Sequence, residues 1–285
     1  MCKSDAKVAF LYDGVGKAYL NLEVVRQHLG HWLPWLPCEI RADLLARRVN
    51  KETKPMLNME LLVQRLCGTR VLNHDREVDR LRQMLKPELD AERRLLVGRS
   101  RPADGIIYDG NELQRIAYGL IAPIERHLAN IHIWFTDRLF ATWEETDRRY
   151  HARVILCGQP SIISTTGMVH APARQRTYYL ARRLGLAHDG NMECSDENFL
   201  GNEDPRATEA AKGYAMQAVS WAITGEPFCD DSHCRLYNAH WQREMLTAQL
   251  GGVDYCPRHR ALFARWPSPS GDLKHMRRLT RGEDR

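Results

Sequence analysis

Apolar positions alternate between short runs and helical spacing over the first 45 residues, which predicts strands joined by a helix. Residues 7–13 (KVAFLYD) form an apolar run ending in Asp-Gly, which is typical of a buried strand and its turn. Apolar residues recur at helical spacing over residues 19–29, and residues 37–40 are expected to form the next strand. The chain therefore opens with a predicted βαβ unit. Gly14 and Gly16 indicate a strand-to-helix turn rather than a dinucleotide loop, because the third glycine of that motif is missing.

Residues 44–100 are heavily charged, with the 3.6-residue period of helices over residues 57–66 and 78–89. Charges alternate along DREVDRLRQMLKPELDAERR, which predicts an exposed helical pair. We interpret this segment as a helical insertion on the solvated surface. A lid or a partner-binding hairpin is the alternative.

The middle of the chain predicts further strands and one helix. Residues 105–109 are expected to form a strand, followed by a helix from Asn111 to His127. Asn111 would cap this helix, with Gln114 as the reciprocal capping-box residue. Residues 131–136 are expected to form a strand.

Beyond that strand, residues 142–147 are interpreted as a polar connection. Residues 154–157 and 161–164 then predict one strand that is broken near Gly158 and Pro160.

The C-terminal half predicts two helices separated by a loop. The first, around residues 178–185, is amphipathic and stops at Gly185. Residues 189–204 are acidic and rich in Asn and Gly, which is typical of a loop. Residues 206–223 predict a helix that ends at Gly225. A flexible basic tail is expected over residues 266–285.

Composition narrows the classes of protein. The net charge is +5, but Arg is mixed with Asp and Glu along the chain, so we expect a solvated surface rather than a nucleic-acid interface. No run reaches the ~18 apolar residues of a membrane span, and the N-terminus has no apolar signal core. We therefore expect a cytoplasmic protein with no membrane partner. The eight cysteines are expected to be thiols and metal ligands rather than disulfides.

The spacing of four residues predicts a structural zinc site. Cys229 and Cys234 form C-x4-C, and Cys256 and His259 form C-x2-H after a gap of 21 residues. Two close pairs of such ligands are what a tetrahedral structural zinc requires. His233 could compete as a ligand, but the C-x4-C and C-x2-H set fits the spacing better.

These motifs resemble, in their order, those of the archaemetzincin family of zinc metallopeptidases. The family has H-E-x-x-H-x-x-G-x-x-H, a C-x-M turn and a later C-x-x-C. The residues 184–188 (LGLAH) are similar to the family's L-G-L-x-H, and residues 234–236 (CRL) fall at C-x-M. Residues 255–259 (YCPRH) fall at F-C-P-x-C, with His259 in place of the last Cys, and residues 162–165 fall at the edge strand of the family's sheet. The resemblance covers roughly residues 104–263.

Three catalytic positions of the family are changed in this chain. Tyr178 stands at the first metal histidine, Tyr179 at the general-base glutamate and Arg182 at the second histidine. His188 matches the third histidine. Because a metzincin needs three imidazoles on zinc and a carboxylate base, the resemblance implies the fold and the structural zinc without ordinary peptidase chemistry.

The resulting expectation is an α/β fold: a metzincin-like twisted mixed sheet with an active-site helix and a C-terminal zinc-stapled subdomain. It comprises a single domain over residues 1–265, with helical insertions at about 44–100 and 189–228, the second lying over the cleft mouth. The main functional hypothesis is a pseudo-peptidase that binds a peptide or protein.

Two enzymatic alternatives stay open. Tyr178, Arg182 and His188 could bind a small anionic substrate in a repurposed cleft. A rebuilt metal site, such as His188 with His170 and Cys194, would instead keep peptidase chemistry.

Overall fold

The computed structural model describes residues 8–46, 58–79, 82–98, 105–127, 129–174, 180 and 199–265. These residues belong to two compact units. Unit 1 comprises Met1–Lys17 and Leu36–Gly167, and unit 2 comprises Ala18–Trp35 and Met168–Arg285. The predicted α/β class is confirmed, since both helices and mixed sheets are present.

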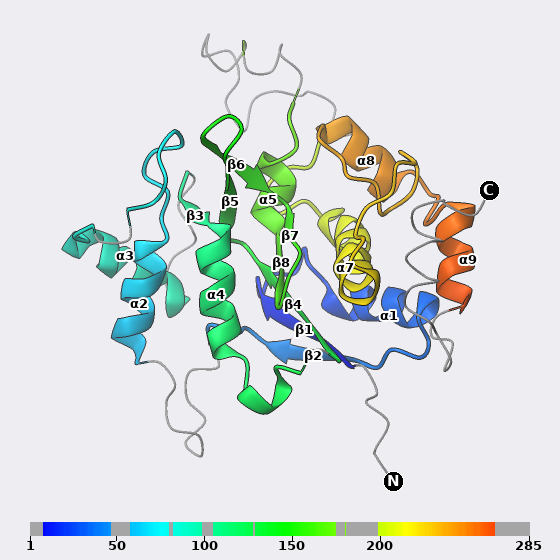
Figure 1. Cartoon of the computed structure of the whole chain (residues 1–285), viewed down its shortest axis with the longest axis horizontal. Coiled ribbons are helices and arrows are strands. Elements are labelled where there is room, and N and C mark those ends of the chain that lie inside the picture. The colour runs from blue at the N-terminus through cyan, green and yellow to red at the C-terminus, as the bar shows by residue number, and fades with distance from the viewer. Residues whose placement is uncertain are drawn as a thin grey trace. The chain divides into compact units, whose positions relative to one another are not determined.

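Unit 1 contains a five-stranded mixed sheet with the order β2-β1-β4-β8-β7 (Figure 1). Its strands are β1 (Val8–Gly14), β2 (Cys38–Ala42), β4 (Asn130–Thr136), β7 (Ile155–Leu156) and β8 (Ser161–Ser164). The first four in spatial order are parallel, and β7 runs antiparallel to β8. The predicted opening strands are confirmed: β1 and β2 are parallel neighbours, and the chain between them forms α1 (Leu22–Trp32).

The predicted broken strand is wrong, because its two halves are separate strands. Ile155 and Leu156 pair with Ile163 and Ile162 across a turn that contains Gly158. As a result β8 lies between β4 and β7, so the segment expected at the edge of the sheet is internal and β7 forms that edge.

A second, three-stranded sheet has the order β3-β5-β6. It consists of β3 (Ile107–Asp109), β5 (Leu139–Glu144) and β6 (Arg149–Arg153). The expected polar connection at 142–147 is therefore wrong over its first half, which continues β5. Leu139 and Ala141 lie on the buried face, and this tertiary packing outweighs the polar character of the following residues.

Helix α4 (Gly110–Leu120) begins and ends earlier than predicted. The cap is Asp109, whose Oδ1 accepts from the N–H groups of Asn111 and Glu112 at 2.9 and 3.1 Å. Asn111 is thus inside the helix, and Gln114 donates to the carbonyl of Pro160 instead of closing a capping box. After α4 a 3-10 turn, η1 (Pro123–Glu125), begins at a proline, which has no N–H to continue the α-helical ladder.

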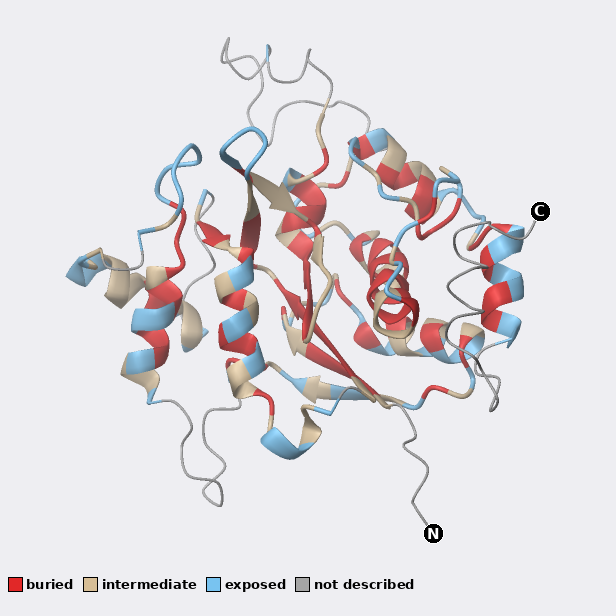
Figure 2. Cartoon of the chain, in the orientation of Figure 1, coloured by how far each residue is buried: buried red, intermediate tan, exposed pale blue. Residues whose placement is uncertain are grey.

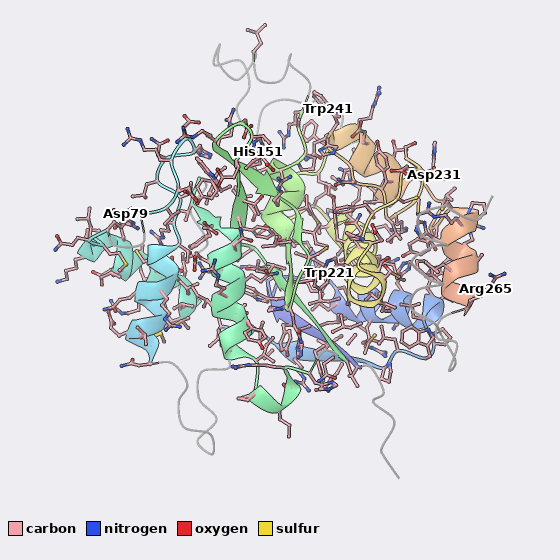
Figure 3. The ribbon with its side chains drawn as sticks, viewed as in Figure 1. Asp79, His151, Trp221, Asp231, Trp241 and Arg265 are labelled. Carbon is pink, nitrogen blue, oxygen red and sulfur yellow. The ribbon has the colours of Figure 1, made fainter. Side chains whose placement is uncertain are left out.

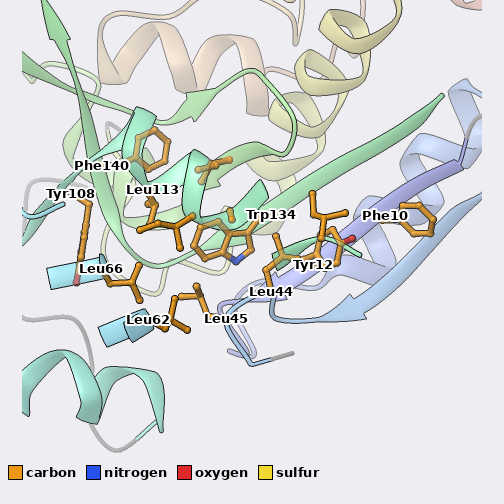
Figure 4. Packing of buried hydrophobic residues seen from close by; sticks show 14 residues of the cluster. Phe10, Tyr12, Leu44, Leu45, Leu62, Leu66, Tyr108, Leu113, Trp134 and Phe140 are labelled. Atoms are coloured by element: carbon orange, nitrogen blue, oxygen red, sulfur yellow. The ribbon is translucent and has the colours of Figure 1, made fainter. Parts of the chain in front are cut away.

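The first helix of the charged segment 44–100 is part of the hydrophobic core and not an addition to the surface. Helix α2 (Met59–Gly68) buries Leu62 and Leu66 in the main hydrophobic cluster of unit 1, beside Tyr108 and Trp134 (Figure 4). Helix α3 (Lys86–Leu96) begins only at Lys86, so the predicted helical period over 78–89 is wrong in its described first half.

Unit 2 is built around helix α7 (Ala207–Thr224), which packs against α1 and α8 (Gln242–Leu250). The predicted helix and its end at Gly225, which has a φ of +79°, are confirmed. Most of α7 is buried (Figure 2), so the described part of the second predicted insertion contributes to the core of unit 2. Alanine and glycine at many positions of α7 allow this close packing.

Two further helices complete the described residues: α5 (Thr165–His170) and α9 (Pro257–Arg265). Of the predicted active-site helix only Leu180 is described, and it is exposed. The tail from residue 266 lies outside the described residues. In the part of the chain that is described, no helix combines the length and the hydropathy that crossing a membrane requires.

Candidate metal centre

The C-x4-C pair forms a tight loop after α7. The N–H of Cys229 donates to the carbonyl of Leu236 at 2.9 Å, and the N–H of Cys234 donates to the carbonyl of Asp231 at 3.0 Å (Asp231 is labelled in Figure 3). The N–H of Asp231 points at Cys229 Sγ, 3.4 Å away. The backbone therefore holds both thiols on the inner side of one turn.

The C-x2-H pair is set by the start of α9. Cys256 immediately precedes Pro257, and its carbonyl accepts from the N–H of Arg260 at 3.0 Å, as the residue before a helix does. His259 is three residues after Cys256, and side chains three residues apart lie on the same face of a helix. Local helix geometry thus brings the thiol and the imidazole together.

The two pairs meet at one point. The potential ligand atoms of Cys229, Cys234, Cys256 and His259 all lie within 4.8 Å of one another, and all four residues are buried. Cys229 Sγ is 3.9 Å from Cys256 Sγ, and His259 Nδ1 is 3.7 Å from Cys234 Sγ and 3.2 Å from Cys256 Sγ. A tetrahedron with Zn–S bonds of about 2.3 Å has S···S edges of about 3.8 Å. The thiols are free, and the donor set and its spacing fit a zinc ion.

Protonation of the three thiols is uneven. The hydrogen bond from the Cys234 thiol lowers the pKa of Cys229, and the same contact raises the pKa of Cys234. Burial raises the pKa of the Cys256 thiol. Three buried sulfurs at this spacing repel as thiolates unless a cation balances them, and a divalent metal ion supplies that charge when bound.

Arg235, next to Cys234, anchors the loop. Its Nε donates to Asp254 Oδ1 at 2.7 Å, and its other nitrogens donate to the carbonyl of Glu209 at 2.9 Å and to the Glu209 carboxylate. Burial raises the pKa values of Glu209 and Asp254, but hydrogen bonds from cationic side chains such as Arg235 have a larger effect. Both pKa values are therefore lower than usual. These contacts attach the cysteine loop to α7 through Glu209 and to the residues before α9 through Asp254.

Aromatic rings line the same region of unit 2. The Tyr255 ring lies 4.9 Å from those of Trp32 and Phe263, and the Phe263 ring lies 6.1 Å from that of His259. The Tyr255 hydroxyl is 2.8 Å from His28 Nε2. These rings help to keep water from the centre.

The alternative ligand His233 is outside the group. Its side chain is 67% exposed and lies near Asp231 and Ser232. This position agrees with the preference for the C-x4-C and C-x2-H set over His233. His170 is exposed at the end of α5.

The predicted cleft residues Tyr178, Tyr179, Arg182 and His188 lie outside the described residues. Cys194, the partner suggested for a rebuilt metal site, does too. Sequence reasoning missed one buried polar cluster, formed in unit 1 by Arg70, Glu92, Tyr108 and Arg138, because no short spacing links its members.

The fold and the centre define an α/β protein with a closed group of three cysteines and one histidine. A family model described as a probable metallopeptidase family (DUF6775) matches residues 5–266, so the chain belongs to that family. The predicted metallopeptidase relationship is confirmed at this level, and the archaemetzincin resemblance stays a prediction.

Comparison with solved structures found a zinc-dependent peptidase from Methanocorpusculum labreanum. It is 14% identical, with a TM-score of 0.39, over 90% of this chain and 99% of that chain. No curated protein matched the chain.

Proposed function

We propose that this chain is a metzincin-like peptidase scaffold that holds one structural zinc, has lost peptidase chemistry and binds a peptide or protein. The zinc would be held by Cys229, Cys234, Cys256 and His259. The cleft would retain the peptidase shape without its catalytic ligands.

The observation that carries the proposal is the closed donor set. A catalytic zinc keeps a coordination position for water, whereas a structural zinc has four protein ligands. Here four buried side chains surround one point, so a metal there has no place for a substrate. At the positions where the resemblance expects catalytic ligands, the chain has Tyr178, Tyr179 and Arg182.

Peptide binding is supported by the two edges of the five-stranded sheet. Edge strand β2 carries Glu39 and Arg41, charges that discourage pairing with another strand. The other edge strand, β7, consists of Ile155 and Leu156, half-buried and uncharged. An extended peptide could add to such an edge through main-chain hydrogen bonds.

A metal count combined with a cleavage assay tests this function. Purified protein is expected to contain one zinc per chain and to leave a panel of unstructured peptides intact. Binding of the same peptides, followed by fluorescence anisotropy, should weaken in Ile155→Lys, which places a charge on β7. The matched control is Ile40→Lys on the already charged edge β2, which should bind as the native chain does.

Two results would reject the proposal. Two zinc ions per chain, with peptide cleavage abolished in His188→Ala, would establish a working peptidase with a rebuilt site. Equal peptide affinity of the native protein and Ile155→Lys would show that peptides do not bind at β7.

A further inference from the structure

Helix α3 is attached to unit 1 in an unusual way. Its one fully buried side chain is a carboxylate, that of Glu92, with no exposed surface. Helix α2 instead buries Leu62, Val63, Leu66 and Cys67. Apolar burial, the usual means of holding a helix to a core, is limited in α3: Leu96 packs partly buried against the main cluster, and the fully buried side chain is charged.

The Glu92 carboxylate is completely surrounded by donors. Arg138 Nη1 donates to Oε1 at 2.6 Å. Oε2 accepts from Arg70 Nε and Nη2 at 3.2 and 2.5 Å, and from the Tyr108 hydroxyl at 2.9 Å. Two guanidinium groups and a phenol around one carboxylate are the donor set of an anion-binding site.

The three donors are positioned by the rest of unit 1 and not by α3. Arg138 follows β4, and its carbonyl accepts from Ser164 Oγ at 2.8 Å. Tyr108 lies in β3 and forms a β-bridge with Arg70. Arg138 Nη1 also donates to the Tyr108 hydroxyl at 2.6 Å. The donors would thus keep their arrangement if α3 moved away.

We propose that Arg70, Tyr108 and Arg138 form a carboxylate-binding site that Glu92 occupies from within the chain. Helix α3 is then a detachable latch, and its release opens the site to an external carboxylate. A buried ion pair adds little net stability compared with apolar packing of the same volume. The pair instead makes the attachment of α3 depend on the Glu92 carboxylate, because loss of that group leaves two buried cations without their anion.

Hydrogen exchange of full-length Glu92→Gln tests the latch. Amides of residues 86–96 are expected to exchange about a hundredfold faster, while those of α4 and β4 keep their native rates. Asp90→Asn is the matched control, since Asp90 is an acid of the same helix paired with Arg93 at the surface. Acceleration throughout unit 1, or an equal effect of Asp90→Asn, would overturn the latch.

Binding of formate to Glu92→Ala tests the site. Calorimetry is expected to show saturable binding of formate to this variant, no binding to native protein and none to Glu92→Ala/Arg138→Met. Chloride at the same ionic strength controls for general salt effects. Absence of formate binding in a folded Glu92→Ala would overturn the site, and if that variant does not fold, the exchange experiment on Glu92→Gln decides alone.

Discussion

Two buried polar clusters, one in each unit and both formed by described residues, solve a similar electrostatic problem in different ways. In unit 1, the Glu92 carboxylate is paired with the guanidinium groups of Arg70 and Arg138, so both signs of charge come from side chains. In unit 2, three thiols and an imidazole converge with no cation from the chain among the four. The first cluster is formed by the chain's own groups, whereas the second is expected to take up an ion from outside.

This difference predicts where stability depends on the environment. A structural zinc contributes folding free energy directly, so unit 2 should respond to metal availability. The network of unit 1 should respond to mutation of its members and not to chelators.

The largest effect is expected for His259→Ala, compared with His233→Ala. Structural zinc in small domains contributes roughly 10–16 kcal/mol of apparent binding free energy, so loss of one ligand should remove the metal and unfold the region around α9. His233 is exposed and outside the group, so its removal should change the free energy of unfolding by less than about 0.5 kcal/mol. Zinc content by mass spectrometry and thermal melts with and without chelator measure both.

Equal zinc content and equal melting temperature in the two histidine variants would refute the metal centre. Retained zinc in His259→Ala combined with loss in His233→Ala would show that the ligand set is wrong.

The next effect is expected for Arg138→Met. Removing Arg138 takes one donor from the Glu92 carboxylate and one from the Tyr108 hydroxyl, but Arg70 still pairs with Glu92, so the expected cost is that of lost hydrogen bonds to a charged group, about 1.5–3 kcal/mol. Arg115→Met is the control, since Arg115 pairs with Glu112 at the surface and should contribute about 0–1 kcal/mol. Urea unfolding with and without chelator checks the contrast: the loss in Arg138→Met should be the same in both conditions. A loss that appears only in chelator would tie the two clusters together.

The same contrast explains which site could be predicted from the sequence. Cys229 and Cys234, and Cys256 and His259, are neighbours in sequence, and the short spacing of each pair already fixes a turn or a helix start. Only the meeting of the two pairs required the fold. The members of the other cluster come from α2's end, α3, β3 and the end of β4, and an isolated Arg or Glu in a charged segment gives no sign of burial.

Errors in the fold prediction have a similar origin. The apolar run that forms most of β1, and the apolar residues of β4, predict strands, because central strands of a parallel sheet are covered on both faces and rich in apolar residues. Strand β5 differs from the prediction over its second half, because its first three residues are buried whereas its end, from Thr142 to Glu144, is polar and half-buried. The sequence predicts the charged segment at the surface because charged residues dominate it, whereas the burial of Leu62 and Leu66 depends on partners far along the chain.

An effect of pH on stability, of intermediate size, is expected from His28, whose Nε2 lies 2.8 Å from the Tyr255 hydroxyl. Burial lowers the pKa of His28 from 6.5 to about 4. Because the folded-state pKa is below the unfolded value, the unfolded state binds more protons as pH falls from 6.5 to 4, and stability decreases over that window. The loss from this group should reach about 2 kcal/mol at pH 5.

His28→Gln should therefore be less sensitive than native protein between pH 7 and pH 5 by about this amount. Urea unfolding at both pH values measures the slope, and zinc content determined in parallel separates it from protonation of the metal ligands. A variant that keeps the full native slope would assign the pH dependence to the metal centre alone.

The smallest effects should come from the two glutamines behind the cysteine loop. Gln217 Nε2 donates to the carbonyls of Arg235 and Tyr237, both at 3.2 Å, and Gln249 Nε2 donates to that of Arg235 at 3.0 Å. Both amide oxygens are buried and accept no hydrogen bond within the described part of the chain, in contrast to the fully bonded carboxylate of Glu92.

Replacement of either glutamine by Leu removes these donors and also an unsatisfied acceptor, and the two contributions to the free energy of unfolding partly cancel. We expect Gln217→Leu to cost about 1 kcal/mol and Gln249→Leu close to zero, with zinc content unchanged in both. Urea unfolding in excess zinc measures the difference, and a loss of metal in either variant would show that these amides position the ligands as well as the loop.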